Sequence, residues 1–228
     1  LPIYRELGFL PEAVRNYLLR LGWSHGDQEI ISTEQAIAWF DLAQVGRSPA
    51  RFDLAKLTSL NAHYLREAGN ARLVELILPR LEAAGLAVDA GGQERLLLGM
   101  DGLKQRARTL VELAEAAGFY VRPRPLPVAE KALRLLDPAA REVLGALTQA
   151  LAGVEPWDEA GLEAACRAKA EALGLGFGKL AQPLRVALTG STVSPGIFEI
   201  MRVLGRAEVL GRLEDAARGC NCAAAQLG

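Results

Sequence analysis

One short stretch of the sequence carries residues suited to hold a negatively charged or hydrogen-bonding partner. It runs over residues 176–205, GFGKLAQPLRVALTGSTVSPGIFEIMRVLG. Gly190 follows an apolar run with helical spacing, where a residue of positive φ commonly ends a helix. Ser194 and Pro195 then predict a second helix start, because Ser caps free N–H groups and Pro fits the first turn. Arg185 would then lie near a helix N-terminus, which suits an anionic ligand, although the same spacing also fits an ordinary helical corner with a solvated arginine.

The composition is that of a helix-rich chain without membrane spans. It has 228 residues, 50% of them hydrophobic, a mean hydropathy of +0.13 and a net charge of −1. No apolar run approaches the roughly 20 residues that cross a bilayer, and no signal segment is evident at the N-terminus. The three cysteines, Cys166, Cys220 and Cys222, are an odd number, and the last two lack a second ligand pair for a metal. We therefore expect a cytoplasmic protein without a disulfide framework or metal site.

Basic residues gather locally although the net charge is close to zero. Residues 102–134 hold seven basic and three acidic side chains, and residues 176–228 hold six basic and four acidic. Such patches can meet phosphate, but they are also common on solvated surfaces. Charge alone therefore does not decide whether the chain binds nucleic acid.

Helical periodicity predicts an all-α fold for the elements that must position these residues. No strand pattern, heptad run or internal repeat of useful length appears. Thr109 and Glu112 have the spacing of a capping box, which places Arg106 and Arg108 just ahead of a helix start.

Three further local signals predict helix boundaries. Asn70 is expected to cap a helix, and Pro79 is expected to kink or split it. The pair Gly91–Gly92 is expected to interrupt the chain before the next apolar segment.

Long runs of this sequence resemble bacterial glutamyl-tRNA synthetases. YRELGFLPEAVRNYLLRLGWSHGDQEIIS and SPARFDLAKLTSLNAHYLR are similar to the region after the signature loop of the catalytic domain. In that family this region is helical and contacts the inner side of the tRNA. The runs RARTLVELAEAAGFY, GKLAQPLRVALTG and SPGIFEIM resemble the helical anticodon-binding region. The resemblance implies a stem-contact domain over residues 1–68 and two helical anticodon-binding domains over residues 69–154 and 155–228.

The resemblance also implies which residues would contact the anticodon. In the second anticodon-binding domain they are an arginine, the SPG loop and two weaker neighbours: Arg185, Ser194, Ile197, Gln182 and Thr189. In the first domain the contact falls on Arg108, with Arg106 as the alternative. Arg108 would read the third anticodon base, where glutamate and glutamine tRNAs differ, because a planar fork of donors favours one base edge. A solvated pair ahead of a helix explains the same two arginines.

The motifs that do chemistry in a class I synthetase are missing. The sequence has no HIGH-type or KMSKS-type motif, no P-loop, no GxGxxG after a strand and no credible Ser/His/Asp or Cys/His set. The resemblance therefore implies a C-terminal half without catalytic residues or a cofactor of its own. The intact enzyme would attach glutamate to its tRNA with ATP and Mg²⁺. The partner would be glutamate tRNA, with glutamine tRNA as a second candidate, and we expect a monomer.

Two other functions remain as alternatives. A helical protein-interaction module with no RNA role explains the Ala- and Leu-rich helices and the near-neutral charge, but not the matched runs. A hydrolase or ligase would need His25 or His63, and neither has a partner Asp or Cys at motif spacing. The sequence leaves open whether the enzyme discriminates between glutamate and glutamine tRNAs.

Overall fold

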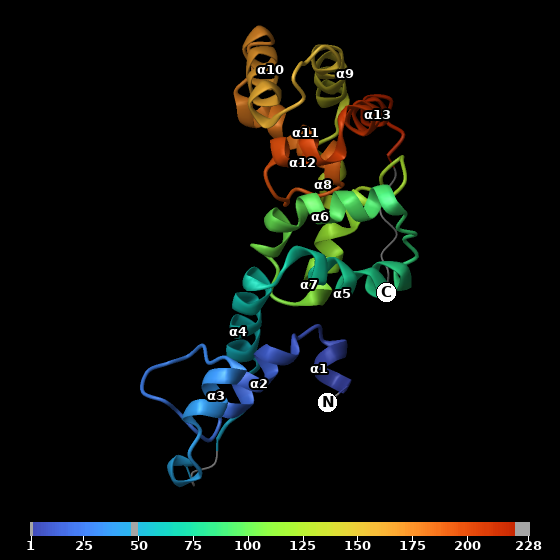
Figure 1. The fold of residues 1–228 in the computed structure, drawn as a ribbon. Helices are drawn as coiled ribbons and strands as arrows, with labels where there is room; N and C mark the ends of the chain where they lie inside the picture. Colours follow the sequence, from blue (N-terminus) through green and yellow to red (C-terminus); the bar gives the residue numbers. More distant parts are fainter. Residues whose placement is uncertain (1, 47–49, 222–228) are drawn as a thin grey trace. The chain divides into compact units, whose positions relative to one another are not determined.

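A computed structural model describes residues 2–46 and 50–221 of the chain. Within these residues it consists of α-helices and two short 3-10 helices and contains no β-strand (Figure 1). The predicted all-α class is confirmed. The chain divides into two compact units, Leu1–Ala84 with Lys104–Glu115, and Gly85–Leu103 with Ala116–Gly228. The division into three domains stays a prediction.

The first unit is built around two packed helices, α2 and α4. Phe9, Tyr17 and Leu57 form a buried cluster there. The capping box of Ser32 and Gln35 begins α3, and Asp53 caps α4 through a bond to the Lys56 N–H. The elements of this unit are α1 (Pro2–Glu6), α2 (Pro11–Arg20), α3 (Thr33–Trp39), η1 (Leu42–Gln44), α4 (Leu54–Glu67), α5 (Asn70–Ala83) and the start of α7 (Leu110–Ala117).

The second unit is a helical bundle with α11 at its centre. This helix contacts α9, α10, α12 and α13, which surround it in Figure 1. Its buried face includes Leu180, Leu184 and Leu188, spaced by four residues. The elements are α6 (Ala90–Lys104, whose last residue belongs to the first unit), η2 (Gly118–Tyr120), α8 (Glu130–Leu133), α9 (Pro138–Ala152), α10 (Glu159–Ala172), α11 (Phe177–Thr189), α12 (Ile197–Leu204) and α13 (Arg206–Ala217).

Two of the predicted helix boundaries are wrong. The N-cap of α5 is Gly69, and Asn70 is already helical. Pro79 lies inside α5 and does not split it, while the expected kink stays a prediction. The Gly91–Gly92 pair lies within α6, where the Asp89 carboxylate accepts a hydrogen bond of 2.7 Å from the Gly92 N–H. In a helix interior each glycine costs about 1 kcal/mol relative to alanine. The hydrogen bond to Asp89 offsets such a cost in the first turn of α6.

None of the helices among the described residues is long and apolar enough to cross a membrane. Cys166 is buried in α10 and Cys220 is exposed, both as free thiols. Cys222 lies outside the described residues.

Candidate nucleic-acid interface

The C-terminus of α11 is held in place at Gly190. This residue has φ +74° and its N–H donates to the Val186 carbonyl, so the predicted left-handed cap is confirmed. Its own carbonyl accepts from the Ala129 N–H at 2.9 Å. A Cβ at Gly190 would collide with the carbonyl oxygen of Pro127. The position therefore requires glycine both for its φ and for the close approach of another backbone segment.

The sequence predicts that Ser194 caps α12, and this prediction is wrong. The N-cap is Gly196, which has no side chain to offer, and α12 begins at Ile197. The Ser194 hydroxyl instead donates to the Pro195 carbonyl at 2.8 Å and accepts from Arg185. Because the hydroxyl is used inside the loop, residues 191–196 form a separate, internally bonded segment between the two helices. We call residues 191–196 the recognition loop.

Arg185 holds the recognition loop from the side of α11. Its Nη1 donates to the Ser194 hydroxyl, to the Ser194 carbonyl at 3.3 Å and to the Pro195 carbonyl at 2.8 Å. The side chain is half-buried. Arg185 thus lies beside the segment that leads into α12, and three acceptors of the loop surround this nitrogen.

Thr189 is the last residue of α11 and Ile197 is the first residue of α12, so the two residues flank the recognition loop. The Thr189 hydroxyl lies 2.8 Å from the Arg185 carbonyl, to which it donates, and accepts from the Ser191 N–H at 3.2 Å. Ile197 is only 5% exposed. Its side chain belongs to the core, so it can serve a ligand only through its backbone, in the first turn where helical N–H groups have no partner within the helix.

The exposed tip of the recognition loop includes residues that the sequence analysis missed. Val193 is 68% exposed, and Thr192 and Gly196 are exposed beside it. Gln182 is also exposed, on α11. The short run between Gly190 and the SPG triplet, which includes Ser191 and Thr192, could have predicted this exposed tip.

Arg106 and Arg108 lie in the first unit, in the turn before α7, and both are exposed. The Arg108 guanidinium donates to the Glu112 carboxylate, with Nη2 at 2.8 Å and Nε at 3.3 Å. These bonds lower the pKa of Glu112. The Thr109 hydroxyl accepts from the Glu112 N–H, so that half of the predicted capping box is confirmed. The Glu112 carboxylate accepts from the Arg108 N–H as well, rather than closing the box.

The backbone at Arg108 is fixed by a buried asparagine. Asn61 of α4 is fully buried, and its amide donates to the Arg108 carbonyl at 2.6 Å while its oxygen accepts from the Leu10 N–H at 2.7 Å. The Leu110 N–H also donates to the Gly8 carbonyl at 2.8 Å. The exposed guanidinium of Arg108 is thus carried on a backbone segment that is hydrogen-bonded to α4 and to Gly8.

The structure brings together one group of the predicted residues within the second unit: Arg185, Thr189, Ser194 and Ile197. Gln182 lies on the same helix as Arg185, one turn earlier. Arg106 and Arg108 belong to the first unit and form their own site.

A basic pocket in the first unit also escaped the sequence analysis. It has a volume of about 530 Å³, and its lining includes the cations Arg20, Arg51, Lys56 and Arg66 together with His63. One carboxylate, Glu29, lines it as well and pairs with Arg20 at 3.8 Å. The signal was present: Lys56, Ser59, His63 and Arg66 recur every three or four residues along α4 and share one face. An excess of cations in a hollow attracts phosphate groups.

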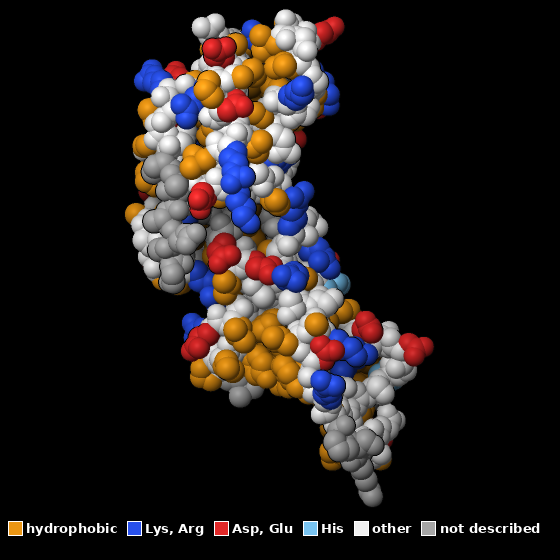
Figure 2. Space-filling view, turned by 180° about the vertical axis from the view of Figure 1, so that it is seen from behind, with side chains coloured by type: hydrophobic (Ala, Val, Ile, Leu, Met, Phe, Trp, Pro, Cys, Tyr) orange, Lys and Arg blue, Asp and Glu red, His pale blue; other side chains and the backbone are white. Residues whose placement is uncertain are grey.

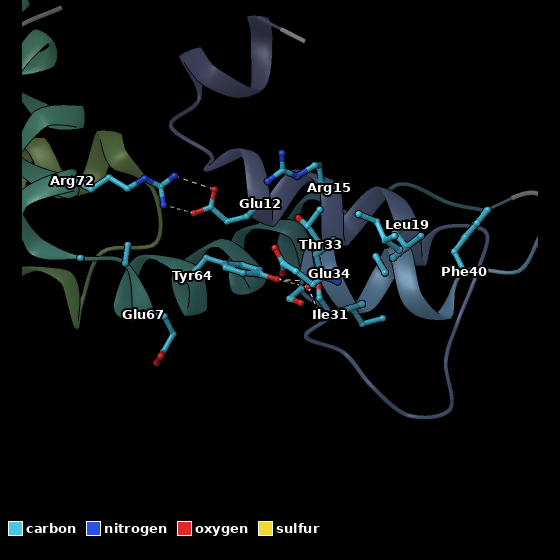
Figure 3. Close-up of a pocket in the computed structure, with 16 residues that line it drawn as sticks. Glu12, Arg15, Leu19, Ile31, Thr33, Glu34, Phe40, Tyr64, Glu67 and Arg72 are labelled. Atoms are coloured by element: carbon cyan, nitrogen blue, oxygen red, sulfur yellow. Dashed lines mark hydrogen bonds and ion pairs between the residues drawn. The ribbon is translucent and has the colours of Figure 1, made fainter.

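A second pocket in the first unit has mixed polarity (Figure 3). Its volume is about 880 Å³, and none of the predicted site residues lines it. Arg72 and Glu12 form a bidentate ion pair at its edge, with distances of 2.6 and 3.1 Å. Tyr64 donates to the buried Asn16 at 2.8 Å. Its charged rim is therefore at least partly paired within the protein.

An apolar patch covers another face of the first unit (Figure 2). It corresponds to a groove of about 1210 Å³ that is lined by apolar side chains of α1, α2 and α5, among them Tyr4, Val14, Leu18 and Leu76. No predicted site residue lies in it.

The two histidines lie in different surroundings. The ring of His25 stacks on Trp39 with 4.3 Å between centroids, and His63 belongs to the basic pocket. Among residues 2–46 and 50–221 no group of three His, Cys, Asp or Glu side chains is placed to hold a metal ion.

The chain matches two family profiles, and the two matched segments meet near the middle of α4. Residues 60–217 match the profile of a family described as an anticodon binding domain. Residues 2–59 match that of the class I tRNA synthetases (E and Q), catalytic domain.

Comparisons with individual proteins find similar sequences and a similar fold. The chain is 56% identical over 214 residues to glutamate–tRNA ligase 2 of Rhodospirillum rubrum, matching 93% of this chain and 46% of that protein. It is 58% identical over 217 residues to glutamate–tRNA ligase 1 of Sphingopyxis alaskensis, matching 93% and 44%. A crystal structure of a glutamate tRNA ligase from Elizabethkingia meningosepticum superimposes with a TM-score of 0.81 at 30% identity, over 94% of this chain and 42% of that one. The chain thus spans less than half the length of these relatives.

Proposed function

Because the chain belongs to the anticodon-binding domain family, we propose that it is the tRNA-binding, C-terminal portion of a glutamate–tRNA ligase and reads the anticodon of glutamate tRNA. The match of residues 60–217 to that family carries the proposal. The similarity to whole glutamate–tRNA ligases supports the choice of tRNA.

The recognition loop is proposed to contact the anticodon. RNA sequence is read mainly where bases are unpaired and splayed, by hydrogen bonds to base edges and contacts to base faces. The exposed residues Thr192, Val193 and Gly196 and the first turn of α12 can supply both kinds of contact. Arg185 holds these groups in one arrangement, so the loop is ordered before RNA arrives and binding costs less entropy.

Arg108 is the proposed reader of the third anticodon base. Its fork of donors already binds one planar acceptor, the Glu112 carboxylate. A base edge with two suitably placed acceptors can replace that carboxylate. Arg106 stays the alternative reader in the same turn.

The basic pocket of the first unit is the proposed contact for the tRNA backbone. Its cations lie on α2, on α4 and in the segment between α3 and α4. Phosphate contacts of this kind position the RNA without reading its sequence. They also make the affinity fall as salt rises.

The activity of the whole protein is a wider proposal. We propose that it attaches glutamate to tRNA in the cytoplasm as a monomer and uses ATP and Mg²⁺. The sequence has neither a HIGH-type nor a KMSKS-type motif. We therefore assign ATP and Mg²⁺ to the part of the relatives that this chain does not cover, and we predict that this chain alone is catalytically inactive.

The test is the binding of three tRNAs, measured by fluorescence anisotropy at two salt concentrations. We expect this chain to bind glutamate tRNA more tightly than glutamine tRNA or phenylalanine tRNA, with an affinity that decreases steeply with salt. Weak and equal binding to all three, with no salt dependence, would contradict the proposal and favour a helical protein-interaction module instead.

A further inference from the structure

Arg212 is a buried charge outside every site described above. It lies on α13, is 1% exposed and is one of the largest fully buried side chains of the described residues. Its Nε donates to Glu208 at 2.8 Å and its Nη1 donates to the Leu188 carbonyl at 2.7 Å. Burial lowers the pKa of Arg212, partly offset by the Glu208 carboxylate. A buried guanidinium is costly compared with an apolar side chain of similar size, so its hydrogen bonds must offset that cost.

The acceptor of Arg212 is at a sensitive place in α11. Leu188 is the residue before Thr189, the last of the helix. Carbonyl groups of a final helical turn have no partner within the helix. A cation there also interacts favourably with the negative end of the helix dipole. Arg212 therefore satisfies and stabilises the C-terminus of α11 from a neighbouring helix.

That C-terminus is where the recognition loop begins. Arg185, which holds the loop, lies three residues before Leu188, and Gly190 follows two residues after it. The Gly190 carbonyl is bonded to the Ala129 N–H on the other side. The end of α11 is thus fixed at two points, by α13 through Arg212 and by the segment before α8 through Ala129.

We propose that Arg212 is a positioning residue for anticodon recognition, which acts by fixing the end of α11 from which Arg185 and the recognition loop project. This rests on the proposed function of the loop. Arg212 itself is buried and does not touch the RNA. Its removal should loosen the loop and reduce the preference for the correct anticodon, while contacts to the RNA backbone remain.

The test compares Arg212→Met with Leu213→Ala in the full chain. Leu213 is the next residue of α13 and is fully buried, so its truncation weakens the packing of the same helix without removing the bond to the Leu188 carbonyl. Affinities for anticodon hairpins of glutamate tRNA and phenylalanine tRNA are measured where circular dichroism shows both variants folded. We expect Arg212→Met to lose about fivefold or more of the parent's preference, and Leu213→Ala to keep it. Amide exchange at residues 190–197 should rise only in Arg212→Met.

Two results would overturn the inference: an unchanged preference in Arg212→Met, or an equal loss in Leu213→Ala. If Arg212→Met does not fold, Arg212→Lys serves instead. It keeps the charge but cannot reproduce the fork that joins Leu188 to Glu208, so a fully retained preference in this variant would also overturn it. A parent chain without any preference would instead refute the proposed function, and this is seen before any variant is made.

Discussion

Arg185 and Arg108 are the same residue type in opposite settings. Arg185 is half-buried in the second unit and its Nη1 is bound to three acceptors of its own loop. Arg108 is in the first unit, its side chain is 64% exposed, and its guanidinium is bound to a carboxylate four residues along the same helix start. Under the proposed function, the first arginine builds the surface that meets RNA, whereas the second exchanges its carboxylate partner for an RNA base. The same side chain thus has two structural settings, and the setting decides which role we propose for it.

The largest expected effect is that of Arg185→Ala. Its removal takes away the bonds that tie the Ser194 hydroxyl and the Ser194 and Pro195 carbonyls to α11, so the recognition loop loses its arrangement. A base contact contributes roughly 1–3 kcal/mol by analogy with DNA readout, and tenfold in affinity is about 1.4 kcal/mol. We expect the affinity for glutamate tRNA to fall by about tenfold or more with the helical content unchanged, as measured by anisotropy and circular dichroism.

Arg218→Ala is the matched control for this variant. Arg218 is the C-cap of α13, and its side chain is 72% exposed, so the substitution removes the same charge from the same unit away from the loop. Unchanged affinity in Arg185→Ala, or an equal loss in Arg218→Ala, would remove Arg185 from the site.

A smaller and different effect is expected for Arg108→Gln. The side chain is exposed, so stability should not change, and the backbone is still held by Asn61. The variant should discriminate less between glutamate and glutamine tRNAs, because the donor fork that distinguishes their third anticodon base is lost. The ratio of the two affinities is the measurement.

Arg106→Gln decides between the two neighbouring arginines. If it relaxes discrimination and Arg108→Gln does not, the reader is Arg106. Equal discrimination by both variants and the parent would exclude this turn as the reader of the third base.

The smallest effect is expected for Glu112→Gln. The carboxylate competes with RNA for Arg108, and its pKa is lowered by that contact, so it is ionised at neutral pH. A neutral amide holds the guanidinium less firmly. We expect a few-fold tighter binding of glutamate tRNA, which should disappear when Arg108→Gln is added.

Glu115→Gln is the control for that charge change. Glu115 is an exposed residue of α7 and is not a partner of Arg108 in the bonds described. If both variants increase the affinity equally, the gain comes from the net charge alone and the comparison of the two arginines loses its support.

Local sequence signals predicted much of the fold. The left-handed cap at Gly190 and the bond from the Glu112 N–H to the Thr109 hydroxyl both depend on residues within a few positions of one another. Where such signals compete, the prediction was wrong: Ser194 has a cap-like sequence position, but its hydroxyl bonds to Pro195 and Arg185 instead.

The sequence by itself determined the all-α class, the resemblance to an anticodon-binding region, and the position of Arg108 in a turn, four residues before Glu112. These features depend on composition and on neighbours along one helix, so no distant contact is needed to specify them. Only the tertiary structure decided the burial of Arg212 against Leu188, the hold of Asn61 on Arg108, and the inward orientation of Arg185. In the first two, residues 24 and 47 positions apart meet, and in the third, hydroxyl and carbonyl groups of a folded loop surround one nitrogen. Which acceptor a buried donor finds depends on how helices pack, and no local pattern encodes that.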